Sequence, residues 1–135
     1  MFFLGKKPKP DAGAAATTKV RGQAAEDQAL AYLQARGLRL LERNYRTPGR
    51  GGGEIDLILQ EADGTVVFVE VRSRSSTGFG GAGSSIGMAK RRRVAQAAQH
   101  WLMRQGRSCN QCPCRFDAVL LDGAHMQWLQ GAWEV

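Results

Sequence analysis

Two neighbouring segments in the middle of the chain constrain its fold. Glu54–Gln60 alternates in polarity, and one predicted face carries Ile55, Leu57 and Leu59. Residues 66–73 begin as a nearly continuous apolar run, which is typical of a central strand covered on both faces. The intervening Ala62-Asp63-Gly64 predicts a three-residue turn with its glycine in the left-handed conformation. We therefore expect a hairpin inside a sheet that has a layer on each side.

The remaining pattern predicts an α/β chain of the order α-β-β-β-α-β-β. Helices are expected over residues 18–36 and 85–104, and the glycine- and serine-rich residues 75–85 read as a mobile loop. Residues 1–17 mix Lys, Pro, Gly and Ala without a period, so they predict a flexible basic tail before a single domain over 18–135. The other strands are expected over 38–46, 115–121 and 125–130.

Composition excludes several classes of protein. No apolar stretch approaches the roughly 20 residues that span a bilayer, and the N-terminus is too short in apolar residues for a signal peptide. The chain has 3 cysteines, Cys109, Cys112 and Cys114. Because no second cysteine pair or finger-spaced histidine accompanies them, reduced thiols are favoured over a structural zinc site. A cytoplasmic location without a membrane partner is the expectation.

The charges are unevenly distributed along the chain. The formal net charge is +7, from 19 basic and 12 acidic residues, yet residues 51–70 contain acids and no base, whereas residues 71–116 contain bases and no acid. A basic protein with a local acidic cluster suits a polyanion held near a divalent cation. A solvated surface with randomly placed charges is the alternative.

Three carboxylates occupy positions where charge is unfavourable. The predicted turn places Asp56 opposite Glu70 and Glu54 opposite Arg72, and like charges across a ladder repel. Glu26 lies on the apolar stripe of the first helix. If Glu26, Asp56 and Glu70 converge, their hard oxygen atoms suit Mg²⁺ or Mn²⁺. Alternatively, Glu26 lies at the helix start and the two strand acids pair with arginines.

Basic residues precede and begin the second helix. Lys90 lies in line with the apolar residues of this helix, so its side chain is expected to reach inward. The run Lys90, Arg91, Arg92 and Arg93 covers a whole turn, and part of it is expected to contact phosphates, as is Arg74. A solvated helix end is the alternative.

Six segments together resemble the YraN family of small bacterial proteins. They are 21–26 (RGQAAE), 43–46 (RNYR), 53–58 (GEIDLI), 67–74 (VFVEVRSR), 90–92 (KRR) and 115–117 (RFD). The family is placed in the restriction-endonuclease-like superfamily, near archaeal Holliday-junction resolvases. The resemblance implies a mixed sheet of about five strands flanked by helices.

The resemblance also implies roles for individual residues. Asp56 and Glu70 would be the metal-binding acids, with Glu26 as the helix acid. The third position of the superfamily pattern is usually lysine, and here it is Arg72. Arginine stays charged, so Arg72 could hold a phosphate but could not readily act as a base, and Lys90 is a candidate substitute.

These observations lead to one functional expectation and two alternatives. We expect a nucleic-acid-binding protein, a Mg²⁺- or Mn²⁺-dependent endonuclease on structured or branched DNA, in which Glu54 assists the metal-binding acids. As partner we expect DNA rather than RNA. The first alternative is a module of the same fold that binds nucleic acid without catalysis. The second is an accessory ribonucleoprotein component. Resolvase-like relatives suggest a homodimer.

Overall fold

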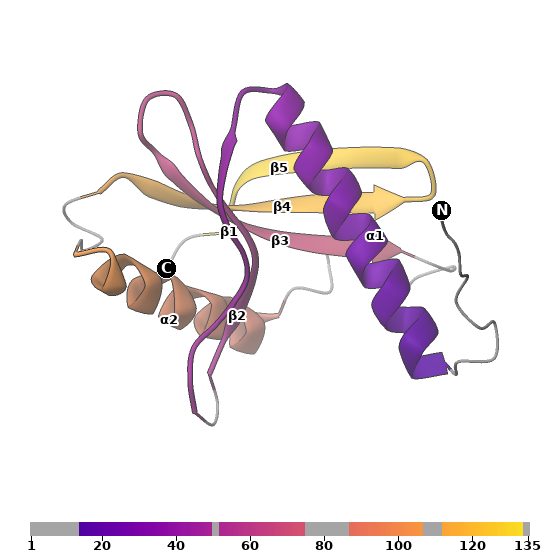
Figure 1. The fold of residues 1–135 in the computed structure, drawn as a ribbon, viewed down its shortest axis with the longest axis horizontal. Helices are drawn as coiled ribbons and strands as arrows, with labels where there is room; N and C mark the ends of the chain where they lie inside the picture. Colours follow the sequence, from indigo (N-terminus) through magenta and orange to yellow (C-terminus); the bar gives the residue numbers. More distant parts are fainter. Residues whose placement is uncertain (1–13, 50–51, 75–86, 107–111, 134–135) are drawn as a thin grey trace, which may run out of the picture.

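The computed structural model describes residues 14–49, 52–74, 87–106 and 112–133. The elements follow in the order α1 (Ala14–Ala35), β1 (Arg39–Arg46), β2 (Glu54–Gln60), β3 (Val66–Arg74), α2 (Met88–Arg104), β4 (Cys114–Asp122) and β5 (His125–Trp133) (Figure 1). The predicted α/β class and element order are confirmed. No helix among these described stretches has the length and apolar character needed to cross a membrane.

The strands form one five-stranded mixed sheet in the order β1-β2-β3-β4-β5. β3 and β4 run parallel, and the other neighbouring pairs are antiparallel. A parallel pair needs a crossover connection, and α2 lies within the one between β3 and β4. The sheet is strongly twisted, so β1 and β2 run steeply across the direction of β3, β4 and β5 (Figure 1).

The two helices cover opposite faces of the sheet, which explains the apolar run of β3. Val67 and Val69 pack in the core cluster that contains Ala29 and Leu33 of α1. Phe68, between them in the chain, packs instead in the cluster on α2. All three β3 side chains have no solvent exposure. Alternate residues of a strand point to opposite faces, so a strand between two layers must be apolar on both.

The predicted hairpin register between β2 and β3 is confirmed. Leu57 pairs with Val69, and Gln60 pairs with Val66. At the turn, the Glu61 N–H donates to the Thr65 carbonyl over 2.9 Å. Gly64 has a φ of +97°, the left-handed conformation predicted for it.

The ends of several elements differ from the prediction. α1 begins at Ala14, four residues before the predicted start, and residues 14–16 are alanines, the best helix formers. α2 begins at Met88 rather than 85. The rest of the predicted tail, residues 1–13, and the predicted loop 75–85 lie outside the described residues.

The predicted apolar face of β2 is wrong at one position. Leu57 and Leu59 pack under α1, but Ile55 packs in the α2 cluster together with its β1 partner Tyr45. Asn44, opposite Asp56 in this register, has a φ of 52°, and a left-handed residue interrupts the alternation of a strand. Beyond Asn44, the ends of both strands therefore pack toward α2.

Replacing Gly53 by alanine is expected to lower the free energy of unfolding by about 2 kcal/mol. A Cβ atom on Gly53 would lie 1.9 Å from the Arg93 carbonyl oxygen of α2, so a backbone segment would have to move. Urea unfolding measures the change. Gly22→Ala is the control, because no atom lies within 4 Å of its added Cβ. Because position 22 lies inside α1, the free energy of unfolding of this variant is expected to rise by up to about 1 kcal/mol. Equal stabilities of the two variants would contradict this packing.

Candidate functional site

The site lies where β2 and β3 separate. Their ladder pairing ends at Leu57 and Val69, one step before Asp56 and Glu70. Here the Val71 N–H donates to the Asp56 side chain, Oδ2, over 2.8 Å. A side chain thus takes over a hydrogen bond that a neighbouring strand would make. This contact fixes the Asp56 carboxyl between the two strands, beside Glu70.

Glu70 is a buried acid held by two cations from different elements. Its Oε2 atom lies 3.5 Å from Lys90 Nζ of α2 and 3.4 Å from Arg72 Nε of β3. The Arg72 contact is an ion pair without hydrogen-bond geometry. The other oxygen, Oε1, is buried and has no hydrogen-bond partner. A buried acceptor left without a partner is costly, so a proton on Asp56 or a cation beside this oxygen would stabilise it.

Both acids have a raised affinity for protons, mainly because they are removed from water. Burial, followed by the charge of Glu70, raises the pKa of Asp56 to about 7. Burial also raises the pKa of Glu70, while the charges of Lys90 and Arg72 oppose this rise. Perturbed acids of this kind cluster at functional sites, although structural ion-pair networks produce them too.

Asp56 is expected to make the protein less stable as the pH rises. The folded chain keeps the Asp56 proton up to a pH of about 7, whereas the unfolded chain loses it near 3.8. The folded state therefore binds more protons between these values, and the free energy of unfolding falls as the pH rises through them. The side chain of Asp56→Asn can still accept a hydrogen bond from the Val71 N–H. The free energy of unfolding of this variant is expected to exceed that of wild type by about 2 kcal/mol near pH ~8 and by little below pH ~4.

Urea unfolding at a series of pH values measures this difference. Asp27→Asn is the matched control, because the Asp27 side chain is 64% exposed. If the free energy of unfolding of wild type and of Asp56→Asn changed with pH in parallel, the charge on Asp56 would not destabilise the folded protein.

Glu26 lies near the pair but is held by its own partners. Its side chain is 15% exposed and lies 3.4 Å from Arg43 Nη2, an atom that also lies 2.9 Å from Asp27. Burial, and then the charge of Asp56, raise the pKa of Glu26, and hydrogen bonds from Arg43 and Asn44 lower it. Within the described stretches, no group of three or more His, Cys, Asp or Glu side chains is placed to hold a metal. The predicted convergence of three acids thus reduces to the Asp56–Glu70 pair, with Glu26 beside it.

The other predicted site residues are spread around this pair. Glu54 lies 3.6 Å from Arg46 of β1, not against Arg72, because β2 has left β3 at this point. In the basic run, Arg91 is half-buried, and Arg92 and Arg93 are exposed. Arg74 ends β3, and its side chain lies outside what the structure describes.

Sequence reasoning assigned no role to two residues that organise the site. Arg43 and Asn44 both lie in the 43–46 motif, and both bond to Glu26. Asn44 was detectable as a residue tolerant of the left-handed conformation inside a strand. The partner of Arg43 was not, because Glu26 lies 17 positions away on another element.

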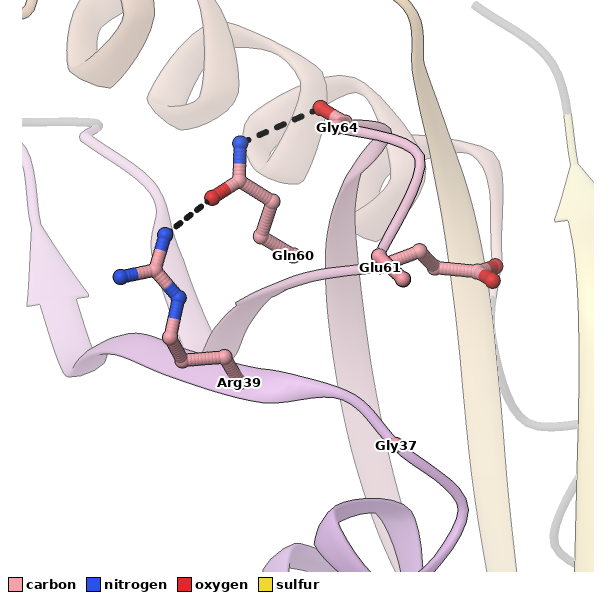
Figure 2. Close-up of a pocket in the computed structure, with 6 residues that line it drawn as sticks. Gly37, Arg39, Gln60, Glu61 and Gly64 are labelled. Atoms are coloured by element: carbon pink, nitrogen blue, oxygen red, sulfur yellow. Dashed lines mark hydrogen bonds between the residues drawn. The ribbon is translucent and has the colours of Figure 1, made fainter.

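One pocket among the described residues lies away from the acid pair. An open pocket of about 460 Å³ lies at the turn end of β2 and is lined by Gly37, Arg39, Gln60, Glu61, Ala62 and Gly64. Figure 2 shows Gln60 bridging it, since it accepts from Arg39 Nη2 over 2.5 Å and donates to the Gly64 carbonyl over 3.2 Å. Asp56 and Glu70 do not line this pocket.

Asp117 is a buried carboxylate outside the acid pair, and its hydrogen bonds indicate a structural role. Asp117 of β4 has no solvent exposure. It accepts hydrogen bonds from Arg115 Nε at 3.0 Å, Trp128 Nε1 at 2.9 Å and the Gly131 N–H at 2.9 Å. The Arg115 side chain also forms an ion pair with Glu61. Asp117 therefore joins β4, β5 and the end of β2, as a satisfied buried group does.

Comparison with known proteins identifies the family. The model of the family described as Uncharacterised protein family UPF0102 matches residues 25–121, which include β2, β3 and α2. A UPF0102 protein of Acidovorax sp. (strain JS42) is 63% identical over 134 residues, covering 99% of this chain and 98% of the relative. One of Paracidovorax citrulli (strain AAC00-1) is 62% identical over 136 residues, with the same two coverages.

A more distant relative belongs to the same family. A UPF0102 protein of Cupriavidus pinatubonensis (strain JMP 134 / LMG 1197) is 50% identical over 119 residues, covering 88% of this chain and 89% of the relative. The resemblance read from the sequence motifs is thereby confirmed. The chain belongs to the UPF0102 family, the YraN family, whose placement among restriction-endonuclease-like proteins agrees with the mixed sheet found here.

Proposed function

We propose that this protein binds nucleic acid and acts as a Mg²⁺- or Mn²⁺-dependent endonuclease on structured or branched DNA. The observation that carries the proposal is the pair of half-buried Asp56 and buried Glu70, with one unpartnered Glu70 oxygen and two cations beside it. The proposal places the protein in the cytoplasm, together with chromosomal DNA.

The pair fits a hard divalent cation. Mg²⁺ is usually bound by one or two carboxylates together with waters and substrate phosphates, so a third protein acid is not required. Asp56 and Glu70 would hold the ion, and the unpartnered Glu70 Oε1 supplies a free oxygen ligand. A bound ion would activate water and neutralise charge on a phosphodiester.

The basic side chains near the pair have complementary tasks. Arg72, 30% exposed, reaches solvent beside Glu70 and can hold a phosphate through its outer nitrogens. The exposed Arg92 and Arg93 can contact the backbone further along, which makes binding salt-dependent.

Metal binding tests the basis of the enzyme proposal. Mn²⁺ is expected to raise the melting temperature of wild type by several degrees, because it binds the folded state and relieves the repulsion between the acids. Asp56→Ala is expected to lose this rise, and the matched Asp27→Ala variant to keep it. An unchanged melting temperature of wild type across the titration would remove the support for a metal enzyme.

Cleavage identifies the substrate class. The protein is incubated with four-way junction, flap, single-stranded and duplex DNA, and with a structured RNA, in the presence of Mg²⁺ or Mn²⁺. Metal-dependent products from the branched DNA are expected. Products from RNA alone would replace the DNA proposal with an RNA one.

A catalytically inactive binding module is the second candidate. Two observations favour it, namely Arg72 in place of lysine and the two cations that already neutralise Glu70. It predicts binding of the same substrates without products, whereas an accessory ribonucleoprotein component predicts no affinity for DNA at moderate salt. Arg72→Lys is expected to increase any cleavage if the arginine is what limits it.

A further inference from the structure

Lys90 reaches the acid pair from the first turn of α2. This helix begins at Met88, so the whole predicted loop 75–85 lies between Glu70 and Lys90 in the sequence. Its Nζ nevertheless lies 3.5 Å from Glu70 Oε2, the same oxygen that Arg72 Nε approaches to 3.4 Å. Both cationic side chains are 30% exposed. The site therefore has one cation from the strand and one from the helix, each with a path to solvent.

The two cations are not equivalent in their geometry. Arg72 directs its inner nitrogen, Nε, at Glu70, whereas Lys90 does so with the end of its side chain. The Lys90 charge opposes the raised pKa of both Asp56 and Glu70, and that of Arg72 opposes the rise of Glu70. Lys90 thus lies within electrostatic reach of both acids. An ammonium group has three donors, so it can contact Glu70 and a phosphate oxygen together.

The surroundings of Lys90 favour an anion. The first turn of α2 contains no acidic residue, and Gly87 at its N-cap makes no side-chain cap hydrogen bond. The neighbouring Arg92 and Arg93 are exposed. An approaching phosphate would therefore meet positive charge and no carboxylate from this helix.

We propose that Lys90 contacts the scissile phosphate with its ammonium group, which reaches the acid pair from α2. Arg72 then holds Glu70 through its inner nitrogen, and its outer nitrogens stay available for a phosphate further along the backbone. This inference rests on the proposed endonuclease function. It implies that Lys90 competes with a divalent cation for Glu70 before substrate binds, because both interact with the same carboxylate.

The variant Lys90→Met tests this proposal, because its Mn²⁺ affinity and its cleavage rate are expected to change in opposite directions. Its affinity for Mn²⁺ alone, measured by calorimetry on the full chain, is expected to rise about fivefold, because a positive charge beside Glu70 is gone. Its cleavage of the preferred DNA at saturating Mn²⁺ is expected to fall about 100-fold, the usual cost of losing one charge-stabilising donor. Arg104→Met, which removes an exposed charge from the far end of α2, is the control and is expected to change neither by more than about twofold.

Relocating the amine distinguishes a catalytic contact from a structural ion pair. The double variant Arg72→Lys with Lys90→Met is expected to recover cleavage to within about tenfold of wild type. Lys90→Met cleaving as fast as Arg104→Met would overturn the assignment of Lys90 while leaving the endonuclease intact. An unaltered Mn²⁺ affinity would overturn the competition for Glu70. A wild type that binds Mn²⁺ but cleaves none of the substrates would instead overturn the proposed function, and the assignment of Lys90 with it.

Discussion

Replacing Glu70 by glutamine is expected to lower metal-dependent cleavage by about 1,000-fold. Glutamine keeps the shape of the side chain but removes the charge that would hold a divalent cation beside Asp56. It also leaves Lys90 and Arg72 without their common partner, so the arrangement of both cations is lost. Initial rates on the preferred DNA at saturating Mn²⁺ measure the effect.

A second glutamate provides the control for this experiment. Glu42 is half-buried on β1, and its Oε1 accepts from Trp101 Nε1 over 2.9 Å, which a glutamine oxygen can also do. Glu42→Gln is therefore expected to cleave within about threefold of wild type. Melting temperatures establish that both variants are folded. Full activity in a folded Glu70→Gln protein would show that the pair is not a metal site.

Replacing Asp117 by alanine is expected to lower the free energy of unfolding by about 4 kcal/mol. The change removes the acceptor for Trp128 Nε1 and for the Gly131 N–H, and it leaves part of the Arg115 charge without a counter-ion. The Trp128 and Gly131 contacts are partly buried, so the donors that remain lose more than an exposed pair would. Urea unfolding followed by tryptophan fluorescence reports the loss.

The surface aspartate Asp27 is a suitable comparison for Asp117. Its ion pair with Arg43 lies at the surface, where such pairs contribute at most about 1 kcal/mol. Asp27→Ala is therefore expected to change stability by less than that. A similarly small effect of Asp117→Ala would show that β4 and β5 are joined by apolar packing alone. Neither change should alter the Mn²⁺ response, because Asp117 lies outside the acid pair.

The hairpin that carries the two acids could be predicted because its determinants are local. The turn around Gly64 sets the register, and an alternation of period two then decides which residues face each other. The same reasoning failed at Ile55, where the left-handed Asn44 on the neighbouring strand interrupts the alternation. A pattern read along one strand contains no information about a distortion in its partner.

The amino-acid order alone determined the class of fold, the β2–β3 register, the inward reach of Lys90 and the family, since each depends on short-range periodicity or on motifs. Only the tertiary structure decided which charges meet. The docking of α2 brings Lys90 to Glu70, β1 brings Arg43 to Glu26, and the separation of β2 from β3 turns the Asp56 carboxyl to the Val71 N–H. These contacts join distant segments, and their geometry follows from the twist of the sheet and the packing of helices, which no local pattern encodes.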